Sequence, residues 1–294
     1  MVVTGTGKRD EERAVDIELA PQRIFALKDQ VSADDARQKA MDRRATAIAS
    51  GIGGLLQRPK PEDITLIASQ RRVEPFWHVA GRARYVYERS HGYTVPPSSP
   101  EVRAVEFGGT TYDVVESKAG RGFQIQVTEH CREDVVDELY VDALTGQPSP
   151  DAASIRGGVA EEVQDPAALA TEGTIVLSPE HRASFVVRQL LTRMMKPVHA
   201  DTVQEEVLTL EHSDLYYRPI WAFEFHWAPK DKSGVLEVDA LTGQIRQAAS
   251  LTAHMTKLIS REALFDIGAD TVGLLVPGGS IAVKVARAAL DRSY

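Results

Sequence analysis

The side chains that could carry out chemistry in this sequence are mainly eight histidines and a single cysteine, Cys131. No two histidines have the H-E-x-x-H spacing of a helical zinc site, and one cysteine cannot build a cysteine-based zinc site. Glu224 and His226 lie two residues apart in an alternating segment, so a strand would place both on one face. A carboxylate beside an imidazole could hold a metal ion or act as a general acid–base pair. A solvent-facing polar row explains the pair equally well, and we predict no catalytic residue and no cofactor.

Two ten-residue segments are nearly the same. Glu138–Gln147 recurs as Val235–Gln244, with eight of ten positions identical. In each copy a strand is followed by an aspartate whose carboxylate can accept backbone N–H groups, and by a glycine that can adopt a left-handed conformation. A metal ion or phosphate bound by the aspartate and threonine is the alternative. The turn residues that we predict are Asp142, Thr145, Gly146, Asp239, Thr242 and Gly243.

The repeat extends upstream of the turns, because Pro75–Trp77 resembles Pro219–Trp221 at a greater distance from its turn. We therefore expect extra strands in the first copy. The predicted fold class is α+β, with two related helix-on-antiparallel-sheet units and a C-terminal helical hairpin. The predicted boundaries are a disordered charged arm over 1–22, a first unit over 23–150, a linker over 151–173, a second unit over 174–250 and the hairpin over 251–294.

Helix and strand signals support this division. Ser32 can cap a first helix, because Asp35 follows three residues later. A second helix should begin at Ser178, where Pro179 takes the first helical position, and it should end before Pro197. The alternate residues of Leu215–Trp227 form a bulky apolar face, which predicts a strand packed against the preceding helix.

The segment from Ser178 to Ile245 resembles a PepSY domain, and residues 102–147 resemble it more faintly. The resemblance rests on Trp221 in the long strand and on Val238–Ala240 with Thr242–Gly243. PepSY domains are small units of a helix on an antiparallel sheet. They occur in secreted protease propeptides, as inhibitors or chaperones, and in membrane-associated bacterial proteins. Because this chain shows neither a signal-like segment nor a protease domain, the resemblance implies only a non-catalytic binding module.

Composition excludes several classes of protein. The 34 lysines and arginines against 42 acidic residues give a net charge of −8, which argues against a nucleic-acid binder that works through its overall charge. The uncharged run over 271–283 is shorter than the roughly 20 residues of a membrane-spanning helix. The N-terminus has no signal-peptide core, and a single cysteine fits a reducing compartment, so we expect a cytoplasmic protein.

The C-terminal region contains two apolar segments, Leu264–Val276 and Ile281–Leu290, which we interpret as helices. Such helices must be buried by their own chain, by a partner or by lipid. We predict a non-catalytic interaction or regulatory module that binds a protein partner or forms a homo-oligomer through its sheets and terminal helices. The alternatives are a metal- or small-ligand-dependent enzyme or sensor at Glu224 and His226, and peripheral membrane contact through the terminal helices. Candidate interface residues are Trp77, Trp221, Leu274, Leu275, Ile281 and Val285.

Overall fold

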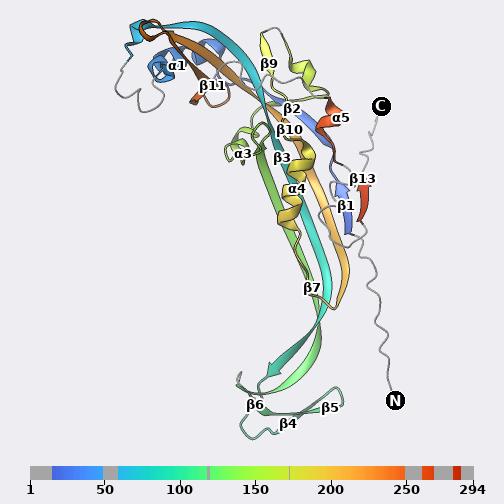
Figure 1. Cartoon of the computed structure of the whole chain (residues 1–294). Coiled ribbons are helices and arrows are strands. Elements are labelled where there is room, and N and C mark those ends of the chain that lie inside the picture. The colour runs from blue at the N-terminus through green and yellow to red at the C-terminus, as the bar shows by residue number, and fades with distance from the viewer. Residues whose placement is uncertain are drawn as a thin grey trace, which may run out of the picture.

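Three long strands dominate the computed structural model, which describes residues 15–48, 59–117, 120–171, 173–248, 260–267 and 281–285. These strands are β3 (Ile64–Val95), β7 (Gly120–Asp142) and β10 (Thr202–Trp227). β3 lies between the other two and pairs antiparallel with both. Figure 1 shows the three strands as a long curved sheet that runs most of the length of the molecule.

Shorter strands complete this sheet along its edges. The outer edge of β10 is paired in succession with β11 (Lys232–Asp239), β2 (Gln22–Leu27) and β1 (Val15–Leu19), the last two parallel to it. β9 (Thr174–Val176) lies parallel to β3 next to the end of β7. The result is a mixed sheet of eleven strands. Its remaining members are β6 (Val115–Ser117), β8 (Ala160–Val163), β12 (Ile245–Ala248) and β13 (Ile281–Val285).

A separate hairpin joins β4 (Ala104–Phe107) to β5 (Thr110–Asp113) through Gly108 and Gly109. Both glycines have positive φ, which is the backbone conformation that a two-residue hairpin turn needs. This hairpin lies at the far end of the β3–β7 ribbon, beyond the reach of β10 (Figure 1). The extra strands expected in the first copy are therefore a projecting addition to the sheet.

Two helices pack on the sheet at different places. α4 (Ala183–Met194) covers β3 and β7, and α1 (Ala33–Asp42) covers β11 and β10. Ser32 caps α1 by accepting the Asp35 N–H at 3.1 Å, as the sequence predicts. α4 starts later than expected, with Arg182 at its N-cap position. The buried face of α4 consists of Ala183, Val186, Val187, Leu190, Leu191 and Met194.

The chain has two halves, one from β2 to β7 and one from β9 to β12. The first strand and the first helix of each half pack on the other half. β2 and α1 precede β3 in the chain but lie on β10 and β11, whereas β9 and α4 precede β10 but lie on β3 and β7. The registers correspond, because Ile24–Ala26 runs beside Leu215–Tyr217 as Thr174–Val176 runs beside Arg71–Val73. The two halves are thus interlocked, and each completes the core of the other.

The predicted α+β fold of two separate helix-on-sheet units is wrong. The protein is mostly β-structure, organised in one large mixed sheet with five short α-helices among the described residues. The physical reason is that β3 pairs with β10 from Ile64 to Glu88, so both halves share a single sheet. The alternation of side chains along a strand shows which face is buried. It does not show which distant strand will pair with it.

Three segments also differ from their expected structure. Residues 15–19 of the predicted arm form β1, where Ile17 is fully buried. The predicted linker contains α3 (Ala152–Ile155) and β8. Residues 281–285, predicted as helix, form β13, which pairs in parallel with β1. A short helix, α5 (Arg261–Leu264), lies on the core before it, with Leu264 buried.

Leu274 and Leu275 lie outside the described residues, so the structure does not place these two candidate interface positions. Across the part of the chain that is described, no helix has the length and apolar character required to cross a membrane.

Candidate functional site

The two copies of the repeated segment form the same turn. Asp142 Oδ1 accepts the N–H groups of Leu144 and Thr145 at 2.9 Å, and Asp239 Oδ1 accepts those of Leu241 and Thr242 at 2.7 and 2.8 Å. The glycine of each turn, Gly146 or Gly243, has φ of 71°. Each carboxylate is thus engaged by backbone donors, which is the turn chemistry that the residues predict.

The surroundings of the two turns also match. Ala143 donates its N–H to the Pro75 carbonyl, and Ala240 donates its N–H to the Pro219 carbonyl. The carbonyl of each alanine then accepts two successive N–H groups from the segment before a helix. For Ala143 these donors are Glu180 and His181, and for Ala240 they are Gln30 and Val31. The two turns therefore anchor the exchanged helices.

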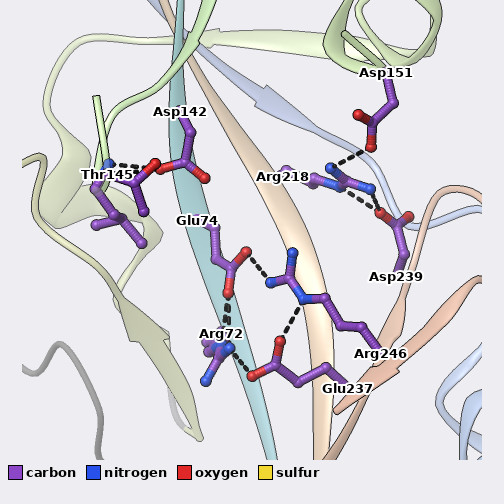
Figure 2. Close-up of polar contacts among 10 residues, drawn as sticks. Arg72, Glu74, Asp142, Thr145, Asp151, Arg218, Glu237, Asp239 and Arg246 are labelled. Atoms are coloured by element: carbon purple, nitrogen blue, oxygen red, sulfur yellow. Dashed lines mark hydrogen bonds and ion pairs between the residues drawn. The ribbon is translucent and has the colours of Figure 1, made fainter. Parts of the chain in front are cut away.

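A ring of four charges, of which Arg72, Glu74 and Glu237 are buried and Arg246 is half exposed, lies beside the second turn. Arg72 contacts Glu74 and Glu237, and Arg246 contacts the same two carboxylates, as Figure 2 shows. Burial alone would lower the pKa of Arg246, but the charges of Glu74 and Glu237 outweigh it and raise that pKa. With two cations and two anions the ring has no net charge. Its geometry fixes the positions of β3, β11 and β12 and does not by itself offer a reactive group.

A second ion pair joins this region to α3. Arg218 contacts Asp239 and lies 3.5 Å from Asp151, which precedes α3 (Figure 2). Arg218 also stands directly opposite Glu74 in the β3–β10 pairing. Asp239 thus accepts the backbone N–H groups of its turn through Oδ1 and binds Arg218 through Oδ2. Figure 2 shows no such ion pair at Asp142.

The predicted pair Glu224 and His226 does not gather a metal site among the described residues. His226 Nδ1 lies 3.4 Å from Ser233 Oγ, and its Nε2 lies 3.8 Å from the exposed Asp231. Neither residue belongs to a group of three metal-ligating side chains in the described chain. The pair stays a prediction, and the described residues form no group of three ligands with it.

A different polar row crosses four neighbouring strands. Asp214 of β10 stands directly opposite Arg23 of β2 on one side and His78 of β3 on the other, and His78 stands opposite Tyr140 of β7. Asp214 and His78 are each only 1% exposed. Arg23 donates to both oxygens of Asp214, at 3.0 and 3.1 Å. The Tyr140 ring stacks on His78 at 4.7 Å between centroids, which closes the row.

His212 adds a second imidazole to this row. Its Nδ1 lies 3.2 Å from Asp214 Oδ2 and 3.1 Å from Arg23 Nη2. A cavity of about 410 Å³ opens beside His212 and His78, with Glu138 and Arg156 also on its wall. His78, His212 and Asp214 are the described residues that could hold a metal ion.

The Asp214 carboxylate is kept ionised by its neighbours. Burial would raise the pKa of Asp214, but the nearby His78 imidazole, the Arg23 guanidinium and the His212 imidazole outweigh this effect and lower it. Sequence reasoning missed this row, although His212 and Asp214 have the same two-residue spacing as Glu224 and His226. The spacing of His212 and Asp214 would have indicated a shared strand face only if the predicted strand had begun well before Leu215, as β10 does.

The predicted interface tryptophans are largely internal. Trp77 is fully buried, and its Nε1 donates to the His181 carbonyl at 2.7 Å, so it is a core residue and not an interface residue. Trp221 is half-buried and packs against the cluster beneath α1. Ile281 and Val285 belong to β13.

An unpaired strand edge is the most extended open feature of the sheet. β7 pairs with β3 on its inner side, but on its outer side β6 reaches only Gly120–Gly122. From Phe123 to Leu139, no described strand pairs with that outer edge. Alternate residues along this stretch are exposed, including Val136 at 70%.

Comparison with protein-family models, with curated proteins and with solved structures found no match for this chain. The PepSY resemblance stays a prediction from its residues.

The two aspartate turns should differ in their contribution to stability. Asp142→Ala removes two backbone hydrogen bonds and should lower the free energy of unfolding by about 1–2 kcal/mol. Asp239→Ala also leaves Arg218, whose side chain is 12% exposed, without its main partner, and should cost about 3–5 kcal/mol. Urea denaturation of both variants measures this difference. Equal losses would show that the Arg218 pair contributes nothing.

The Asp214 row should make stability depend on pH. Because the folded pKa of Asp214 is lowered, its stabilising contribution is present above the unfolded pKa of about 3.9 and is lost as pH falls through the folded value. At pH 7, Asp214→Asn should lower the free energy of unfolding by about 1.5–3 kcal/mol. The gap between wild type and variant should narrow below about pH 4. Asp134→Asn, at a more exposed arginine-paired carboxylate, is the control and should change much less; a gap that widens in acid would contradict the account.

Proposed function

We propose that this protein is a non-catalytic interaction module that binds another polypeptide by strand addition at the outer edge of β7. The observation that carries the proposal is the unpaired edge from Phe123 to Leu139. An exposed strand edge presents backbone donors and acceptors in a row, which is a template for pairing with another chain. The charged side chains on the same edge then select the partner.

A second copy of this chain offers complementary charges on the exposed face of β7. Arg132 and Asp134 lie on the same face of β7, two residues apart. If two β7 strands pair antiparallel about Glu133, Arg132 of each copy stands opposite Asp134 of the other. Within one chain Arg132 already lies 2.8 Å from Asp134, and Arg84 lies 2.9 Å from the other oxygen of that carboxylate. Both arginines can therefore remain next to carboxylates when the edges meet.

We propose that the module works in the cytoplasm. Cys131 is the only cysteine, and it is partly buried on β7. Because an unpaired thiol is typical of a reducing compartment, we place the module in the cytoplasm.

A charge-swap series tests strand addition. Arg132→Glu places like charges opposite each other at two symmetric positions, so the dimer dissociation constant should rise at least about tenfold. The double variant Arg132→Glu/Asp134→Arg reverses both charges and should restore dimerisation. Light scattering across a concentration series measures the association. The control is Glu62→Arg, a charge reversal in the turn just before β3 and outside β7. A wild type that stays monomeric, or a double variant no better than the single one, would refute self-association through this edge.

A further inference from the structure

The row around Asp214 has the donor atoms of a metal site. His78, His212 and Asp214 each offer one ligand atom, and the three atoms lie within 4.8 Å of one another. His212 Nδ1 lies 3.2 Å from Asp214 Oδ2, and His78 Nδ1 lies 3.7 Å from the same oxygen. Ligands that bind one ion at about 2.0–2.2 Å stand roughly 3–4 Å apart, so little movement would bring all three onto a common ion.

The buried histidine supplies an independent observation. His78 Nδ1 has no hydrogen-bond partner, although the side chain is 1% exposed. Its other nitrogen, Nε2, lies 3.4 Å from a carboxylate oxygen of Glu138. When His78 carries its proton on Nε2, toward Glu138, its Nδ1 lone pair is free to bind an ion beside Asp214. In metal sites a carboxylate at the far ring nitrogen orients the binding histidine in this way.

In that tautomer the Asp214 carboxylate and the His78 Nδ1 lone pair face each other, and a cation beside them stabilises both. In the structure Arg23 provides that cation, since its guanidinium contacts Asp214 and His212 Nδ1. His212 Nδ1 lies between the Arg23 guanidinium, a donor, and the Asp214 carboxylate, an acceptor, and with its proton on Nε2 it can offer a lone pair to an ion at this place. The Arg23 side chain is 36% exposed and can turn toward solvent, whereas Asp214 and His78 are each 1% exposed.

We propose that His78, His212 and Asp214 bind a divalent transition-metal ion such as Zn²⁺ or Co²⁺, and that this ion replaces the Arg23 guanidinium. Two imidazoles and one carboxylate are ligands that suit these ions better than Mg²⁺ or Ca²⁺. The ion enters from the cavity beside His212, whose side chain is 40% exposed. Arg23 and the metal ion compete for the same carboxylate, so the site can switch between two cations.

Cobalt binding to the full chain tests the proposal, because bound Co²⁺ produces visible absorption bands when nitrogen and oxygen ligands replace water. Wild type should give such bands, and Arg23→Gln should bind Co²⁺ at least about tenfold more tightly, since the competing cation is gone. Asp214→Asn and His212→Ala should abolish the bands. His212 is partly exposed, so its variant is expected to fold even if replacement of the buried His78 does not, and circular dichroism checks this.

His226→Ala is the matched control, because it removes a histidine from the same strand at the alternative site. It should leave the cobalt spectrum unchanged. The proposal is overturned if neither wild type nor Arg23→Gln shows the bands, if Arg23→Gln binds no more tightly than wild type, or if the bands persist in His212→Ala. Bands that disappear in His226→Ala but not in Asp214→Asn would assign the metal to the Glu224–His226 face instead.

Discussion

The antiparallel pairing of β3 with β10 is the constraint on which the rest of the structure depends. It runs from Ile64 to Glu88 on one strand and from Thr202 to Trp227 on the other, with Glu74 and Arg218 facing each other within it. Every other strand of the main sheet is attached directly or indirectly to this pair. Because each core cluster contains residues from both halves, neither half can complete its core without this pairing.

The exchange of the helices follows from that pairing. The β3–β7 hairpin offers an apolar face that α4 covers, and the β10–β11 hairpin offers one that α1 covers. Each helix is held at its start by the carbonyl of Ala143 or Ala240, next to one of the two aspartate turns. The duplicated turns are therefore structural joints, and their identical sequences reflect the same task performed twice.

Local features of this fold could be predicted from the sequence, whereas its long-range features could not. The Ser32 cap and the Gly108–Gly109 hairpin depend on a few neighbouring residues, so their residue types are sufficient evidence. The pairing of β1 with β13 joins the two ends of the described chain, and no local pattern specifies it. The same limit applies to the candidate site, because Arg23, His78 and Asp214 meet only through the registers of three strands.

Native-state hydrogen exchange tests the shared sheet most directly. If the pairing of β3 with β10 holds both halves together, the slowest amides of β3, β7, β10 and β11 should open in one step, with the same free energy and the same dependence on denaturant. Those amides should exchange only when the whole sheet unfolds. Two groups of amides, one from residues 59–142 and one from residues 173–248, that open with clearly different free energies would contradict the account.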